Sequence, residues 1–378
     1  MKTEKADDCP ILNKFLKKHD IEIIKESEKD FLAEKNKEIN TSYIIRDYAK
    51  AFKNIKTFRN DYSSLKPIYQ VSANNDPLLL ELLSLNDVSF ACFSLNEVKE
   101  VRDISSNPII ITSPILSEEE LKQMSGENIK YFLVDNLEYM LLIKKYFPYA
   151  SLLILFSPDP SKRFGADLLK STLLLKKSKE LELKIEGVYA SVEIENEEEP
   201  ENKEEIKLGK QIEKLKVIFE FYKYDFKVLL SNEESLNLFK IVSNEKENLI
   251  LLSSKICKNY MTACESIYFM KINETKKEIN YHLSTADLYT GRFYHDLDDN
   301  MPHIDEEEKY ETYNCTIYGP TVDTSDLVVG NVLYKKMNIG EKIIFKNVGF
   351  NSTKFSGSRF NGVEMNYMEK KIFNLLNA

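Results

Sequence analysis

The stretch Tyr69-Gln70-Val71-Ser72-Ala73-Asn74-Asn75-Asp76-Pro77 decides how this chain folds. Its first residues suit a short buried strand, and its last residues suit the start of a helix. Asp76 is well placed as an N-cap and Pro77 as the first helical residue, so residues 78–83 are expected to be helical. The stretch therefore predicts a strand that runs directly into a helix.

Short apolar runs alternate with helical patterns from about residue 41 onward. The runs that predict strands are 68–72, 88–93, 109–112, 131–134, 152–156, 187–192, 226–230 and 249–252. The segments that predict helices are 95–103, 118–124, 137–146, 166–181, 210–224 and 235–243. This alternation is typical of an α/β fold, and it predicts a closed parallel (β/α)8 barrel of the TIM type.

Two helix starts carry the Ser-x-x-Glu pattern of a capping box, Ser94 with Glu97 and Ser117 with Glu120. In such a box each side chain hydrogen-bonds the backbone N–H of the other residue. We interpret both glutamates as helix caps.

The pattern changes after about residue 262. Strands are predicted at 267–272, 279–284, 288–294, 313–318, 331–334 and 342–347, with a turn at 338–341. They indicate a second, mostly antiparallel β-domain. The expected division is an N-terminal segment, 1–40, that contributes to the β-domain, a barrel at 41–261 and the β-domain at 262–378.

Charge and composition exclude several classes of protein. The net charge is −9, from 61 acidic and 52 basic side chains, which opposes a nucleic-acid partner. Glycine is scarce, at 11 of 378 residues, and the chain has no Gly-x-Gly loop of the kind that cradles a phosphate. No apolar run approaches the roughly 18 residues of a membrane span, so we expect a cytoplasmic protein without a membrane partner.

The five cysteines show no metal-like spacing, and free thiols in a reducing compartment are expected. Two acid-rich stretches, 193–205 and 296–311, are interpreted as solvated loops, because a metal site needs spaced ligands in a rigid frame. No metal is therefore expected.

Several segments in this order resemble the ornithine and arginine decarboxylases of the alanine-racemase-like barrel type. Residues 69–74 are similar to Tyr-x-Val-Lys-x-Asn, and residues 90–94 to Phe-Asp-Cys-Ala-Ser. Residues 163–166 are similar to Lys-Phe-Gly-Ala, and residues 318–326 to Trp-Gly-Pro-Thr-Cys-Asp-x-x-Asp. Phe360-Asn361-Gly362 is similar to a Phe-Asn-Gly near the family's C-terminus. The resemblance implies the predicted barrel and β-domain.

In that family a lysine forms an imine with pyridoxal phosphate, and Ser72 stands in its place here. A hydroxyl cannot form a Schiff base. The other positions at which the resemblance implies a lost cofactor or catalytic group are Ala91, Phe156, Ser191, Ser253, Ile256 and Val322. Residues 231–233 replace a Gly-Gly-Gly turn for the phosphate. Neither bound pyridoxal phosphate nor catalysis that depends on it is expected. Glu97 coincides with a family glutamate near the cofactor, but we interpret it as a cap.

At three positions the chain keeps the acidic or basic character that the family has there. In the family, the residue at the position of Asp323 binds the amine of the substrate. Asp323 is therefore the residual acidic group expected in the old cleft. Arg163 and Asp326 correspond to a pair that joins two subunits across the dimer interface in the family. The alternative is that Arg163 and Asp326 are ordinary surface charges, since an exposed pair is worth under ~1 kcal/mol.

The resemblance leads to a first hypothesis, a regulatory pseudoenzyme of polyamine biosynthesis. It would form a homodimer, or a heterodimer with an active ornithine decarboxylase. Binding of antizyme is a second route, weakened because the family's basic contact helix here begins Ser117-Glu118-Glu119-Glu120.

A second hypothesis is an enzyme with repurposed chemistry at Ser72, Lys255, Cys257 and Asp323, and a third is a polyamine sensor that uses the old cleft. The plainer interpretation is that Ser72 fills space, Cys257 is a buried thiol and Lys255 is a solvated loop residue. The histidines, His19, His282, His295 and His303, lie outside the predicted barrel strands, so none is available there as a base.

Overall fold

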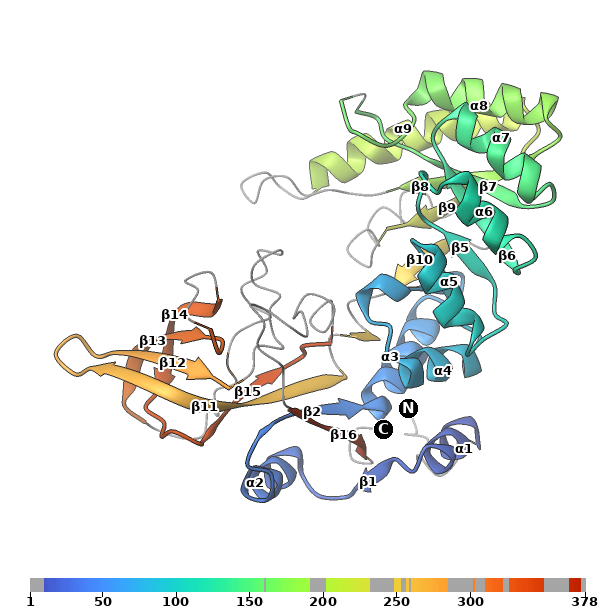
Figure 1. Ribbon diagram of the computed structural model, residues 1–378. Coiled ribbons are helices and arrows are strands. Elements are labelled where there is room, and N and C mark those ends of the chain that lie inside the picture. Colours follow the sequence, from blue (N-terminus) through green and yellow to red (C-terminus); the bar gives the residue numbers. More distant parts are fainter. Residues whose placement is uncertain are drawn as a thin grey trace. The chain divides into compact units, whose positions relative to one another are not determined.

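The structure is a computed structural model that describes residues 10–159, 161–190, 202–231, 248–252, 256–257, 260–284, 302, 310–321, 326–349 and 367–374 (Figure 1). The chain divides into two compact units. Lys56–Ser253 forms the barrel unit, and Met1–Ile55 together with Ser254–Ala378 forms the sheet unit.

The barrel unit is built on eight parallel strands that close on themselves. Its strands are β3 (Lys66–Gln70), β4 (Ser89–Cys92), β5 (Ile109–Ile111), β6 (Ile129–Val134), β7 (Ser151–Leu155), β8 (Lys184–Ala190), β9 (Lys227–Leu230) and β10 (Leu249–Leu252). Closure is made by β10, which pairs in parallel with β3. The predicted (β/α)8 barrel is confirmed.

The described helices of the barrel unit are α4 (Pro77–Leu85), α5 (Leu95–Arg102), α6 (Glu118–Met124), α7 (Leu137–Tyr146), α8 (Leu168–Glu180) and α9 (Asn202–Phe221). Of these, α4, α5 and α6 begin directly after the capping residues that the sequence indicates. Helix α9 begins at Asn202, earlier than the predicted residue 210. The Asp76 carboxylate accepts the Leu79 N–H at 3.3 Å, with Pro77 at the first helical position. Ser117 and Glu120 form the complete capping box. The helix predicted at 235–243 lies outside the described residues.

The box predicted at Ser94 forms only in part. The Ser94 hydroxyl accepts the Glu97 N–H at 3.3 Å, but the Glu97 carboxylate accepts the N–H of Phe93, at 2.6 Å, instead of that of Ser94. Glu97 is still a cap, because it satisfies a backbone donor just before the helix.

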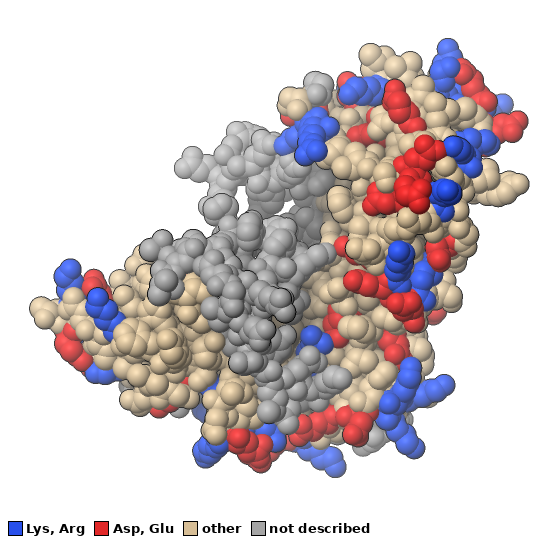
Figure 2. All heavy atoms as spheres, viewed as in Figure 1, with Lys and Arg blue, Asp and Glu red and all other residues tan. Residues whose placement is uncertain are grey.

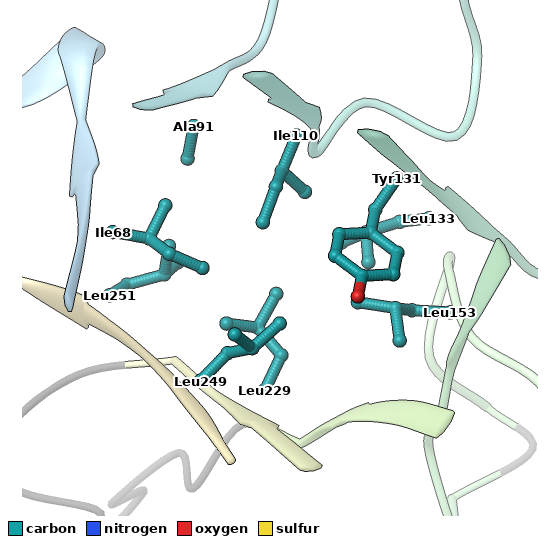
Figure 3. Packing of buried hydrophobic residues seen from close by; sticks show 9 residues of the cluster. All are labelled: Ile68, Ala91, Ile110, Tyr131, Leu133, Leu153, Leu229, Leu249 and Leu251. Atoms are coloured by element: carbon teal, nitrogen blue, oxygen red, sulfur yellow. The ribbon is translucent and has the colours of Figure 1, made fainter. Parts of the chain in front are cut away.

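Alternate residues of the strands fill the barrel interior, as expected for a parallel barrel. Figure 3 shows them converging on one another from around the ring. The buried cluster comprises Ile68, Ala91, Ile110, Tyr131, Leu133, Leu153, Leu229, Leu249 and Leu251. The barrel is therefore a packed core, and any site must lie at one of its ends.

The sheet unit has its own eight-stranded sheet with the order β1-β16-β2-β11-β12-β13-β14, and β15 pairs with β11. Its strands are β1 (Glu22–Ile24), β2 (Ser42–Asp47), β11 (Met261–Asn273), β12 (Glu278–Leu283), β13 (Thr312–Tyr318), β14 (Leu327–Lys335), β15 (Lys342–Lys346) and β16 (Tyr367–Asn374). Pairing is mostly antiparallel, but β1 with β16, β16 with β2, and β12 with β13 are parallel. The helices α1 (Pro10–Lys18) and α2 (Glu28–Glu38) belong to this unit, and α3 (Tyr48–Asp61) runs across its boundary.

The unit boundaries differ from the predicted domain boundaries at 40 and 261. Strand β2 was not predicted, and it pairs with β11 and β16, so the N-terminal contribution to the sheet unit extends to Ile55. The predicted turn at 338–341 is confirmed by the Glu341 N–H, which donates to the Asn338 carbonyl at 3.1 Å. The strand predicted at 288–294 lies outside the described residues.

Candidate functional site

The mouth of the barrel, where the parallel strands end, is where barrels of this kind carry their sites. Strand β3 ends at Gln70, two residues earlier than predicted, and residues 71–73 form a turn of 3₁₀ helix, η2 (Val71–Ala73). The Gln70 side-chain amide donates to the Ser72 hydroxyl at 2.8 Å. Tyr69 donates its hydroxyl to the Asn74 carbonyl at 2.9 Å. Ser72 therefore lies at the mouth, half-buried, in a turn held by its own neighbours.

Two of the positions at which the resemblance implies a lost polar group carry apolar side chains in the described structure. Ala91, at the predicted position of a lost acid, is buried in the barrel core. Phe156, at the predicted position of a lost arginine, is buried, and its N–H donates to the Tyr189 carbonyl at 3.1 Å. Neither side chain can bind an anion or transfer a proton.

The loop after β7 is fixed by an aspartate that the sequence did not single out. The Asp135 carboxylate, just beyond β6, accepts the Gly165 N–H at 2.9 Å. Gly165 has φ +113°, and a Cβ there would lie 2.5 Å from the Cβ of Ser157, so only glycine fits. The exposed guanidinium of Arg163 stacks on Phe164, with Cζ 4.8 Å from the ring centre. Arg163 makes no ion pair with any residue that the structure describes.

Asp326 is a buried carboxylate in the sheet unit, with 0% of its surface exposed. One oxygen, Oδ2, accepts the Thr321 N–H at 2.7 Å. The other, Oδ1, is buried without a hydrogen-bond partner in the described part of the chain. An unsatisfied buried acceptor of this kind costs about 1–3 kcal/mol, and more when it is charged. Asp326 therefore has an acceptor to offer to a cationic donor.

The remaining candidate residues belong to the sheet unit or lie outside the described residues. Ile256 and Cys257 are buried in the sheet unit, where the Cys257 carbonyl lies against Gly349 so closely that a Cβ there would clash. Ser191, Ser253, Lys255, Val322 and Asp323 lie outside the described residues.

The described cysteines, Cys92, Cys257, Cys264 and Cys315, are buried thiols. Among the described residues, no group of three or more His, Cys, Asp or Glu side chains could hold a metal ion. None of the described helices is long and apolar enough to cross a membrane. Figure 2 shows acidic and basic side chains interspersed over the described surface in view, without the basic stripe that nucleic acid requires.

The opposite, amino-terminal end of the barrel holds a buried polar cluster that the sequence did not predict. The Glu186 carboxylate accepts hydrogen bonds from Tyr131 at 2.9 Å, Ser151 at 2.6 Å and Lys227 at 2.7 Å, and it pairs with Lys184 at 2.7 Å. Burial raises the pKa of Glu186, but these four partners outweigh burial and hold its pKa well below the usual range. This end of a barrel carries stability, because sites form at the other end.

Barrel, sheet unit and mouth together define a two-unit protein of the TIM-barrel class with a β-domain. Residues 48–199 match the pyridoxal binding domain of the pyridoxal-dependent decarboxylases, and residues 167–349 match the C-terminal sheet domain of the same enzymes. The chain belongs to this family.

The relatives of the chain include enzymes and an inhibitor protein. It is 24% identical over 346 residues to a probable ornithine decarboxylase of Dictyostelium discoideum, covering 82% of this chain and 75% of that protein. It is also 24% identical over 350 residues to antizyme inhibitor 1 of Mus musculus, covering 82% and 78%. A solved structure with the same fold is the lysine/ornithine decarboxylase of Vibrio vulnificus, with TM-score 0.76, 17% identity, and 93% and 98% of the two chains covered.

Pyridoxal phosphate needs an amine for its imine and cationic or backbone donors for its phosphate. Among the described residues, the two positions that follow each barrel strand contain no lysine and no arginine. The hydroxyl at Ser72 is engaged by Gln70. The described residues of the mouth do not fit this cofactor.

Proposed function

We propose that this chain is a catalytically inactive homologue of ornithine decarboxylase that regulates polyamine biosynthesis. The observation that carries the proposal is Ser72, a hydroxyl at the end of the first barrel strand that accepts a hydrogen bond from Gln70. An imine requires an amine, and the resemblance places the family's lysine at this residue. The apolar side chains of Ala91 and Phe156 support the same proposal, because they offer no alternative base or anion ligand.

The proposed regulation acts through pairing with an active decarboxylase or with a second copy of this chain. Arg163 is an exposed cation without an ion pair in the described part of the chain, and Asp326 is a buried carboxylate with one oxygen unsatisfied. A pair between them across two chains would satisfy both. Because Asp326 is shielded within the single chain, neighbouring groups would move aside as the pair forms.

Binding of antizyme is a second candidate, favoured by the relationship to antizyme inhibitor 1. The surface of α6 argues against antizyme binding, because the family's contact helix is basic and the first turn of α6 holds Glu118, Glu119 and Glu120. Lys145 on α7 is paired with Glu118 at 2.5 Å, so part of the positive charge beside α6 is already neutralised. A pull-down with antizyme from the same source tests this route, and retention of antizyme would establish it.

Activity and absorbance test the loss of catalysis. The purified chain, incubated with pyridoxal phosphate, is expected to show no absorbance from an imine and no release of carbon dioxide from ornithine. Either signal would contradict the proposal.

Co-expression with an active ornithine decarboxylase from the same source tests the pairing. We expect the two chains to elute together and the activity of the enzyme to change. Arg163→Glu should abolish both effects, whereas Arg163→Lys, which keeps the charge, should retain most of them. Unaltered elution and activity with Arg163→Glu would show that this residue does not join the chains.

A further inference from the structure

One face of the sheet unit carries side chains that cross four neighbouring strands in a line. Phe269 on β11 lies opposite His282 on β12, and His282 lies opposite Tyr318 on β13. Tyr318 in turn lies opposite Leu327 on β14. Residues paired in this way project from the same face of a sheet. We call these four residues the aromatic row.

The three rings of the aromatic row contact one another. Phe269 meets His282 edge to face, with ring centres 5.5 Å apart, and His282 stacks on Tyr318 at 5.2 Å with an interplanar angle of 19°. His282 is thereby held between two aromatic neighbours. Its orientation is fixed by packing, and it also hydrogen-bonds the Gly319 backbone.

The two ends of the aromatic row are exposed to solvent, and His282 and Tyr318 between them are half-buried. Phe269 is 49% and Leu327 40% exposed. A bulge in the pairing of β11 with β12 inserts Tyr268 beside Phe269, and Tyr268 is 62% exposed. Aromatic side chains gathered on a surface are enriched at the centres of protein interfaces.

The row ends beside the unsatisfied carboxylate. Asp326 directly precedes Leu327, and its carbonyl accepts the Gly319 N–H at 2.9 Å. An apolar surface next to a buried acceptor fits a partner that brings an apolar contact and a cation. A second copy of this chain meets the second requirement with the exposed guanidinium of Arg163, which itself stacks on an aromatic ring.

The protonation of His282 depends on its burial and on the groups around it. Burial lowers the pKa of His282, while the hydrogen bond to Gly319 and the carboxylate of Asp326 act in the opposite direction without restoring it. On the face that carries His282, the titratable side chains of the neighbouring strands are the exposed Lys271 on β11 and Tyr318 on β13, with the bulged Tyr268 beside Phe269. Glu278 lies on the same face at the far end of β12. The imidazole is therefore neutral at pH 7 and gains its proton as the solution becomes acidic.

We infer that the aromatic row is a contact surface for a second copy of this chain, and that pairing through it weakens when His282 is protonated. The inference rests on the proposed function, because it presumes that chains pair. A charged imidazole in the contact would have to lose its water, and it would compete with the arriving guanidinium for the negative charge of Asp326, whose carboxylate acts on His282.

The dissociation constant of the full chain, measured by sedimentation at pH 7.5 and pH 5.5, tests the inference. We expect weaker pairing at pH 5.5. Phe269→Ser should weaken pairing about tenfold at both pH values, as loss of a central aromatic contact does. His282→Phe keeps the stacking ring without the proton, so its pairing should be the same at both pH values. Leu333→Ser, at a residue of β14 that is 64% exposed and outside the row, should behave as the unmodified chain.

Thermal unfolding establishes that each variant is folded. Pairing that stays equally sensitive to pH in His282→Phe, or that is unchanged in Phe269→Ser, would overturn the inference. Pairing of the unmodified chain that does not depend on pH would overturn it while leaving the proposed pairing intact. A chain that pairs at neither pH, alone or with an active decarboxylase, would remove the inference and the proposed function together.

Discussion

The Lys227 ammonium lies 2.7 Å from the Glu186 carboxylate and joins β9 to β8 at the amino-terminal end of the barrel. The side chain of Glu186 is only 7% exposed and that of Lys227 20% exposed. The effect of such a shielded pair on stability appears mainly when one partner is removed, because the charge of the other partner then stays buried without a counter-charge.

Glu186→Gln is expected to lower the free energy of unfolding by about 2 kcal/mol, since Lys227 would lose its counter-charge in a shielded position. Urea unfolding at pH 7 measures the change. Glu180→Gln, at the exposed pair with Lys177, is the matched control and should have no measurable effect. Equal stability of the Glu186 variant and the unmodified chain would show that the pair does not hold β8 and β9 together.

The contribution of Glu186 to the free energy of unfolding should depend on pH. Its pKa is lowered in the folded chain, so its contribution is fully present above the ordinary carboxyl pKa of about 4.3 and is lost as the pH falls toward the folded value. The difference in unfolding free energy between the chain and Glu186→Gln should therefore be constant from pH 7 to pH 5. It should narrow at more acidic pH. A difference that grows on acidification would contradict this sign.

Gly187→Ala should destabilise the barrel by about 3 kcal/mol, because a Cβ at this residue would lie 2.0 Å from the Lys227 carbonyl oxygen. Strands β8 and β9 would have to separate to admit it. Gly330→Ala is the control, since its nearest neighbour would be 3.8 Å away. Denaturant midpoints of the two variants provide the comparison, and similar midpoints would mean that β8 and β9 can separate without cost.

The barrel could be predicted because its strands and helices are local patterns. Asp76 and Pro77 mark a helix start in the sequence alone, and the structure places α4 there. Strand β2 was missed because nothing near Ser42–Asp47 shows that its partners are β11 and β16, which lie at the far end of the chain. The unit boundary at Ile55 follows from those long-range pairs, so local composition could not locate it.

The candidate site was predictable only where one side chain decides the chemistry. Ser72 could be identified because an amine and a hydroxyl differ in what they can bond. The cluster around Glu186 could not, since it joins four strands and each of its residues appears in the sequence as an isolated polar residue. The aromatic row depends in the same way on the register of β11, β12, β13 and β14.

Ser72→Lys should not create a decarboxylase. The amine alone would restore one group, whereas Ala91 and Phe156 would still offer neither acid nor cation to a cofactor. We expect no carbon dioxide from ornithine in the presence of pyridoxal phosphate, with the unmodified chain as reference. Activity in this variant would show that the mouth still binds the cofactor and that the loss is confined to one residue.

Asp326→Asn separates the stability of the single chain from pairing. The amide oxygen can still accept the Thr321 N–H, and the buried charge with its unsatisfied oxygen is removed, so the free energy of unfolding should stay equal or rise. Pairing should weaken about tenfold or more, because a neutral amide attracts a guanidinium far less than a carboxylate does. Asp225→Asn, at a carboxylate with 74% of its side chain exposed, should change neither quantity. If Asp326→Asn lowered stability and left association unchanged, the carboxylate would serve the fold of the sheet unit alone, and the cation that Arg163 presents would have to meet another acceptor.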